Sequence, residues 1–104
     1  MSNRRLVVVA EGRVAAASVG ASYAAIQSNL SRVINITFAN SLNGDVSISF
    51  DGGTTTYITL PAGQTLSVDL GANHAEYSGT ISIKQGPSGA STTGFISCGV
   101  IKVN

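Results

Sequence analysis

Charged side chains are scarce in this 104-residue chain, where they make up 11% of the residues, against roughly 25% in an average soluble domain. The net charge is +1, and the basic residues are not clustered beyond the pair Arg4 and Arg5. Phosphate recognition needs a basic patch, so the composition argues against nucleic acid as a partner. A surface with few charges and many small residues suits contact with other protein subunits. The alternative explanation of this composition is the low-charge surface of an exported protein.

The chain also has few of the side chains that carry chemistry. It holds one cysteine, Cys98, one histidine, His74, and no tryptophan. One cysteine cannot form an internal disulfide, and the apolar surroundings of Cys98 in the sequence predict a buried thiol. One histidine without partners cannot build a metal site, so we expect His74 in a surface loop. We therefore expect no metal and no cofactor.

The five carboxylates suggest no reaction. Asp51 begins an Asp-Gly turn, where its side chain can accept bonds from backbone amides. Asp45 and Asp51 could share a calcium ion, but their spacing matches no calcium loop. The sequence contains neither a glycine-rich phosphate loop nor a nucleophile elbow, and no convergent acid–base set can be assembled from it. We expect no enzymatic activity.

Long apolar runs are absent as well, and no stretch approaches the ~20 residues that a membrane helix needs. Arg4 and Arg5 precede an apolar run, as in a signal peptide, but that run ends at Ala10 and is shorter than a normal hydrophobic region. We instead predict a first strand at residues 6–9, either covered on both faces or exchanged with a neighbouring subunit.

The clearest feature that is present is a period-two alternation of apolar and polar residues. It recurs at residues 34–38, 46–50, 58–60 and 66–70. Successive side chains of a strand point to opposite faces, so this period predicts four strands with one face on a core. The segments between them hold turn residues, which favours short antiparallel connections: Asn43-Gly44, Asp51-Gly52-Gly53 and Pro61-Ala62-Gly63.

Two further strands follow. Residues 79–84 alternate again, and residues 94–103 are apolar on both faces, which is typical of a strand in mid-sheet or in an oligomer interface. Between them, the composition of residues 85–93 predicts an exposed, mobile loop. Six to eight short strands with regular turn signals indicate an all-β fold, an antiparallel β-sandwich of jelly-roll-like form.

The first third of the chain is less regular. We divide the chain into an N-terminal arm or first strand at residues 1–19 and a β-sandwich domain at residues 20–104. Alanine favours helix, but Gly12 and Gly20 oppose a long one. We therefore expect a strand or extended arm over residues 13–19, then a loop in which Tyr23 and Ile26 serve as anchors.

Several of these motifs occur together in a known family. The segments VSISFDG at residues 46–52, LPAG at 60–63 and GTISIK at 79–84, followed by a small-residue loop and a closing strand, resemble small virion structural proteins of tailed phages. The resemblance spans about residues 23–100. It implies a β-sandwich that serves as an auxiliary capsid protein or at a connector. The chain departs from the family at residues 1–19 and in its ending, which is IKVN rather than an aromatic residue.

We therefore expect a non-enzymatic phage virion protein, made in the host cytoplasm, that binds and stabilises the major capsid lattice as a decoration or cement protein. The expected partners are the major capsid protein or other virion subunits and further copies of this chain, without membrane or nucleic acid. The expected contact residues are Arg4, Arg5, Leu6, Val7, Val8, Val9, Tyr23, Ile26, Pro87, Ile101 and Val103.

Two alternatives remain open. The first is a head-to-tail connector or tail subunit, which is also a structural protein of the virion. The second is a β-sandwich that binds carbohydrate or a host surface. Sugar platforms usually need exposed aromatic side chains, and this chain supplies no tryptophan and only Tyr23, Tyr57 and Tyr77.

Overall fold

Seven antiparallel strands account for most of the chain in the computed structural model, which describes residues 5–73 and 75–104. The strands are connected by turns and loops, two of which contain a single 3₁₀ turn, η1 (Ala16–Ser18) and η2 (Gly71–Asn73). In chain order the strands are β1 (Leu6–Ala15), β2 (Ala24–Asn40), β3 (Val46–Ser49), β4 (Ile58–Leu60), β5 (Thr65–Asp69), β6 (Tyr77–Gln85) and β7 (Phe95–Val103).

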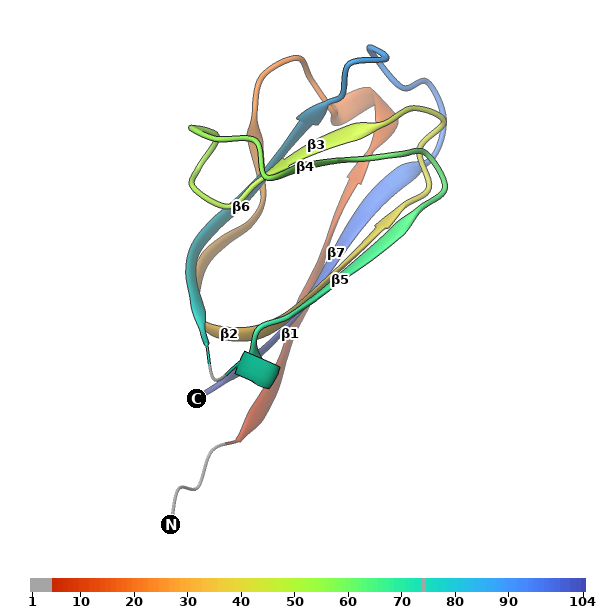
Figure 1. Cartoon of the computed structure of the whole chain (residues 1–104). Coiled ribbons are helices and arrows are strands. Elements are labelled where there is room, and N and C mark those ends of the chain that lie inside the picture. The colour runs from red at the N-terminus through yellow and green to blue at the C-terminus, as the bar shows by residue number, and fades with distance from the viewer. Residues whose placement is uncertain (1–4, 74) are drawn as a thin grey trace.

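The 17-residue strand β2 belongs to both layers of the fold. Its first half, residues 24–33, pairs with β6, and its second half, residues 33–40, pairs with β7 and β5. Between the halves the register shifts repeatedly, and Asn29 and Arg32 take φ angles of 55° and 53°. Such irregularities bend a strand and let it pass from one sheet to another. Figure 1 shows β2 beside β6, turning at the bottom of the view, and rising beside β7.

The bend folds one hydrogen-bonded sheet into two facing layers. One layer has the order β1-β7-β2-β5 and the other β2-β6-β3-β4 (Figure 1). The apolar residues of both inner faces form a single core, whose fully buried members include Val33, Ile36, Phe38, Val46, Ile48, Ile81 and Ile96. This arrangement confirms the predicted all-β, antiparallel, jelly-roll-like sandwich, and the four alternating segments are β3, β4, β5 and the second half of β2.

The strands at the two chain ends differ from each other in their surroundings. β7 lies between β1 and β2, as its apolar character on both faces predicted. β1 is longer than the predicted residues 6–9 and lies at the edge of its layer. Leu6 and Val8 are exposed, so within this chain one face of β1 is uncovered. The expected arm over residues 13–19 is divided between the end of β1 and η1.

The prediction of a loop around Tyr23 and Ile26 was wrong in part. Tyr23 precedes β2, whereas Ile26 lies within that strand. The segment lacks period-two alternation, but Ala24 pairs with Ile83 and Ala25 with Ser82, so the ladder to β6 imposes the strand. Pairing with a distant strand outweighs the weak local preference of alanine for helix.

The loop between β6 and β7 is held by hydrogen bonds that its composition did not predict. The Asp45 carboxylate accepts hydrogen bonds from the Ser88 amide at 3.1 Å and from the Ser88 hydroxyl at 2.6 Å. The Asn43 side-chain oxygen accepts a bond from the Thr92 amide at 2.9 Å. Short polar side chains of one turn therefore hold both halves of the predicted mobile loop.

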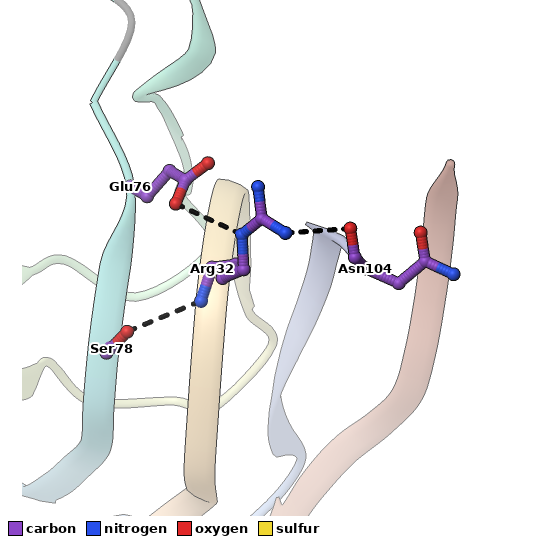
Figure 2. Close-up of polar contacts among 4 residues, drawn as sticks. All are labelled: Arg32, Glu76, Ser78 and Asn104. Carbon is purple, nitrogen blue, oxygen red and sulfur yellow. Dashed lines mark hydrogen bonds and ion pairs between the residues drawn. The ribbon is translucent and has the colours of Figure 1, made fainter. Parts of the chain in front are cut away.

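Arg32, at the bend of β2, fixes the end of β7 (Figure 2). Its Nη1 atom donates to the backbone carbonyl of Asn104 at 2.8 Å, and its Nε atom donates to the Glu76 carboxylate at 3.4 Å. Its backbone N–H donates to the Ser78 hydroxyl at 3.3 Å. Asn104 in turn donates its backbone N–H to the Arg5 carbonyl at 3.2 Å, so these contacts also set where β1 begins.

Candidate docking interface

The outward face of β1 carries exposed apolar side chains next to an unpaired strand edge. Leu6 is 66% exposed and Val8 is 79% exposed, whereas Val9 and Val14, on the opposite face, pack against the core. Among the described strands, β1 pairs with β7 alone. Its other side therefore presents backbone groups that a further strand can pair with.

The hydrogen bond from Asn104 to Arg5 identifies which backbone groups face that free side. In an antiparallel ladder, residues alternate between pointing their N–H and C=O groups at the partner and pointing them away. Because Arg5 points its carbonyl at β7, the next residue, Leu6, points its polar groups away from β7, and so does Val8. Leu6 and Val8 thus present both exposed apolar side chains and available hydrogen-bonding groups.

A bulge limits this edge to the first half of β1. The register with β7 shifts between Val9 and Gly12. There the chain approaches β2 so closely that a Cβ atom on Gly12 would lie 2.2 Å from the Ile26 carbonyl oxygen. The Ala10 carbonyl accepts a bond from the Gln27 side chain at 2.9 Å, so it is occupied within the chain. The regular, available edge therefore comprises residues 5–9.

A shallow hollow of about 260 Å³ adjoins the edge on the outer face of the β1-β7-β2-β5 layer. It lies above Gly99, where an added Cβ would have only the Thr37 carbonyl within 4 Å, at 3.9 Å. Its lining is largely apolar, Asn35 and Thr37 are polar, and Glu11 is the one charged residue; the residues that line it are Val8, Val9, Glu11, Asn35, Thr37, Gly99, Val100 and Ile101. The edge and the hollow together make a neutral, largely apolar surface.

The structure brings only part of the predicted contact set together. Arg5, Leu6, Val8 and Pro87 are exposed, and Val7, Val9, Tyr23 and Ile101 are half-buried. Ile101 pairs directly with Val8 across the β1–β7 ladder, so these two share a face. Arg4 lies outside the described residues.

Two predicted contact residues are core residues instead. Ile26 is 9% exposed and Val103 is 3% exposed, so neither is available to a partner. The sequence predicts Ile26 as a loop anchor and Val103 as part of a closing strand, and neither pattern distinguishes the inner face of a strand from the outer one. Glu11, Thr37 and Gly99 were missed because nothing in their local sequence marks them as neighbours of Val8.

Tyr23 and Pro87 lie on the other layer of the sandwich. The Tyr23 hydroxyl hydrogen-bonds with the Thr56 hydroxyl, and the Lys84 ammonium lies 4.8 Å from the centre of the Tyr23 ring. Tyr23 therefore holds the β3–β4 loop against β6, a structural role within the chain. Pro87 borders a separate depression that Lys84 also lines.

The titratable groups with shifted pKa values have structural explanations. Hydrogen bonds from the Ser49 hydroxyl and the Thr55 amide lower the pKa of Asp51 to about 2, which confirms the predicted turn role. Burial raises the pKa of the Cys98 thiol to about 12, and Cys98 is fully buried, as predicted. Burial also raises the pKa of Tyr77, with a further contribution from the Asp51 charge.

Residues 5–73 and 75–104 contain no cluster of three or more histidine, cysteine or acidic residues that could hold a metal ion. Asp45 and Asp51 lie at opposite ends of β3, which separates them too far to share a calcium ion. The prediction for His74 concerns a residue outside the described ranges. In the described part of the chain, no helix has both the length and the apolar character to span a membrane.

The fold is similar to that of a solved Bacillus endospore appendage, described as a novel family of disulfide-linked pili. The TM-score is 0.58 at 20% sequence identity, and the match covers 97% of this chain and 90% of that chain. A carbohydrate-binding module from Cellvibrio mixtus lichenase 5A, solved with cellotriose, matches with a TM-score of 0.32 at 16% identity, over 99% of this chain and 87% of that one. No family model and no curated protein matches the sequence. At this identity the appendage likeness shows the fold alone, and the second likeness carries no argument.

Proposed function

We propose that this chain is a non-enzymatic structural protein of a phage virion, an auxiliary capsid protein that binds and stabilises the major capsid lattice. The observation that carries the proposal is the exposed apolar edge of β1, where Leu6 and Val8 project from a chain with only 11% charged residues. Natural sandwiches usually protect such an edge with charge, proline or a covering segment. An unprotected edge of this kind suits a protein whose exposed strand is covered by another subunit when the particle assembles.

The resemblance to tailed-phage virion proteins supports the phage assignment. Its motifs occupy the elements that position the layers: residues 46–52 form β3 and the turn after it, residues 60–63 form the turn between β4 and β5, and residues 79–84 lie in β6. These are scaffold motifs, so they account for the sandwich. The docking surface proposed above lies in β1, β7 and the second half of β2.

The mechanism of binding would be burial of neutral surface together with strand addition. Backbone hydrogen bonds at the edge provide affinity, and the neighbouring hollow provides side-chain specificity. A stable protein–protein interface buries about 800 Å² per partner. The accessible surface of this chain is 5680 Å², so such an interface would cover a modest share of it.

The decisive experiment is the composition of the particle. Quantitative mass spectrometry of purified virions would give the copy number of this chain relative to the major capsid protein. We expect a copy number comparable to that of the capsid protein. A count near the number of subunits in a single ring would reject decoration and place the chain at the connector or tail, and absence from the particle would reject a virion role.

A second candidate function is a subunit of a protein filament, because the fold likeness to the endospore appendage spans nearly the whole chain. Disulfide linkage, the feature in that protein's description, is not open to Cys98, whose side chain is fully buried. A filament of this chain would therefore be held by non-covalent contacts. Electron microscopy of the purified protein tests this candidate, since filaments in the absence of virions would favour it.

A further inference from the structure

We infer that a hollow between the two layers of the sandwich is a binding site for one neutral aromatic ring. The hollow has a volume of about 180 Å³, and the residues that line it are Ile36, Phe50, Val68, Leu70, Glu76 and Tyr77. It shares no residue with the β1 edge or with the hollow beside Val8. The inference therefore does not rest on the proposed function.

Both layers contribute walls to this hollow. Ile36 and Val68 lie opposite each other in the β2–β5 ladder, and both belong to or pack against the core, so their side chains face the interior. Leu70 directly follows β5. From the other layer, Phe50 directly follows β3 and Tyr77 begins β6. A ligand in the hollow would therefore contact both layers at once.

Contacts within the chain hold the aromatic wall in place. The Tyr77 hydroxyl donates to the Phe50 carbonyl at 2.6 Å, and the Thr80 carbonyl lies 3.0 Å from the same hydroxyl oxygen. The centre of the Phe50 ring lies 5.5 Å from that of Tyr77, 4.9 Å from that of Tyr57 and 6.2 Å from that of Phe38. These contacts restrain both rings, so neither is free to turn into the hollow and fill it.

The polarity of the lining favours an apolar ligand. Only Tyr77 and Glu76 carry side-chain polar atoms, and both are engaged within the chain. The Tyr77 hydroxyl is bonded to Phe50, and the Glu76 carboxylate accepts a hydrogen bond from the Arg32 Nε atom at 3.4 Å. A water molecule or a polar ligand inside the hollow would give up hydrogen bonds that these side chains do not replace. An apolar ligand that displaces such water would therefore be favoured.

The size and the aromatic wall of the hollow define the ligand further. An apolar cavity of about 150 Å³ is enough to bind benzene, whereas sites for drug-sized ligands have volumes of roughly 300–1,000 Å³. A volume of about 180 Å³ therefore restricts the ligand to a single ring. Aromatic rings favour edge-to-face and offset contacts with one another, so Phe50 and Tyr77 favour an aromatic ring over an aliphatic group of the same size.

Benzene and pyrazine are matched probes of this site, because the two rings have the same shape and pyrazine adds two nitrogen acceptors. In an NMR titration of the purified chain, we expect benzene to shift the amide signals of Ile36, Phe50, Val68 and Tyr77 in a saturable way. Pyrazine should bind about tenfold more weakly, because its nitrogens lose water and meet no available side-chain donor in the lining. Nuclear Overhauser contacts from benzene to the Phe50 and Tyr77 rings would locate the ligand without any substitution.

Val68→Phe should block the site, because the added ring would occupy the space of the ligand, and we expect the affinity for benzene to fall by about tenfold or more. Ser67→Phe is the matched control, since it adds the same ring to the adjacent, exposed position on the opposite face of β5, and it should bind benzene as the wild-type chain does.

The Overhauser contacts and the comparison with pyrazine use the wild-type chain, so they decide the question even if Val68→Phe does not fold. Shifts that do not saturate, Overhauser contacts to residues away from Phe50 and Tyr77, or equal affinities for benzene and pyrazine would each overturn the inference. Unchanged benzene affinity in a folded Val68→Phe chain would overturn it as well.

Discussion

The side-chain amide of Gln27 donates a hydrogen bond to the backbone carbonyl of Cys98 at 3.0 Å, inside the sandwich. The same nitrogen donates to the Ala10 carbonyl at 2.9 Å. One amide group of the first half of β2 therefore joins that strand to both β7 and β1 of the facing layer. Because Ala10 lies at the bulge of β1, this contact also helps determine where the available edge ends.

Gln27→Leu should destabilise the fold, because leucine keeps most of the volume but leaves two carbonyl oxygens without their donor. An unsatisfied buried polar group costs about 1–3 kcal/mol, so we expect a loss of about 2–4 kcal/mol in the free energy of unfolding. Urea denaturation followed by circular dichroism measures it. Gln64→Leu, at an exposed turn position, is the control and should change stability by less than about 0.5 kcal/mol. Equal effects of the two variants would contradict this role for Gln27.

Asn40→Asp and Asn43→Asp form a pair of near-isosteric tests. Asn40 is 2% exposed, and its Nδ2 atom donates to the carbonyls of Leu60 at 3.0 Å, Gly44 at 3.2 Å and Pro61 at 3.2 Å. A carboxylate there would face acceptors in a buried site, so we expect a loss of about 3 kcal/mol or more.

Asn43 is the matched control because its main role is that of an acceptor. Its side-chain oxygen accepts bonds from the Thr92 and Thr93 amides, which an aspartate would also accept. We expect Asn43→Asp to change the unfolding free energy by less than about 0.5 kcal/mol at neutral pH. Thermal unfolding of both variants gives the comparison. If Asn40→Asp were as stable as the wild-type chain, the buried side-chain amide would not be needed as a donor.

The low pKa of Asp51 predicts a specific acid sensitivity. Its pKa falls from the usual 3.8 to about 2 in the folded chain, and the largest cause is the hydrogen bond that the carboxylate accepts from the Ser49 hydroxyl. A group whose pKa is lowered on folding stabilises the folded state above its unfolded pKa, and that contribution is lost as the pH falls toward the folded pKa. Stability should therefore decline between pH 3.8 and about 2.

Asp51→Asn isolates this contribution, since asparagine does not titrate. Chemical denaturation across the acid range should show a smaller decline for the variant than for the wild-type chain. An NMR titration of the Asp51 carboxyl carbon provides an independent check, and a midpoint at the usual 3.8 would count against the hydrogen-bonded turn.

Cys98 should be unreactive in the native chain. Its thiol is fully buried, and burial raises its pKa to about 12, so very little thiolate forms at neutral pH. We expect negligible modification by a thiol reagent until the chain is unfolded, when one equivalent should react. Ser67→Cys supplies an exposed thiol as the positive control, and rapid labelling of the wild-type chain would refute the burial.

The raised thiol pKa also predicts an alkaline effect. The unfolded chain ionises Cys98 near the usual value of 9.0, well before the folded chain does. Proton release from the unfolded state favours unfolding, so stability should fall as the pH rises from 9.0 toward about 12. Cys98→Ala removes this titration, and the pH slopes of the two proteins, measured by urea unfolding, should then differ.

Much of the fold was predictable because its signals are local. The alternation at residues 46–50 and 66–70 matches β3 and β5 to within a residue or two, since a period of two requires neighbours only a few residues apart. Even so, Ser47 and Ser49, placed on a polar face by the alternation, are buried. Their hydroxyls find partners in Thr59 and Asp51, contacts that depend on how the following loop folds back.

The candidate site was predictable only in part. The apolar run at residues 6–9 predicted the strand that carries the candidate interface. Val8 and Val103 both lie in apolar runs of the sequence, yet Val8 is exposed and Val103 is buried. The hollow beside Val8 is formed by Thr37 and Gly99, which are distant in the chain and adjacent only through the β2–β7 ladder. Long-range pairing creates such a surface, so no local pattern reports it.

The sequence by itself determined the strand character of the chain, its turns, its neutral surface and the burial of its single thiol, because alternation, turn residues and composition act over short distances. The tertiary structure alone decided that β2 serves both layers, with left-handed residues Asn29 and Arg32 at its bend, and that β1 is left at an edge. Those outcomes depend on which distant strands pair. That choice is made by the free energy of the whole sandwich rather than by any one segment.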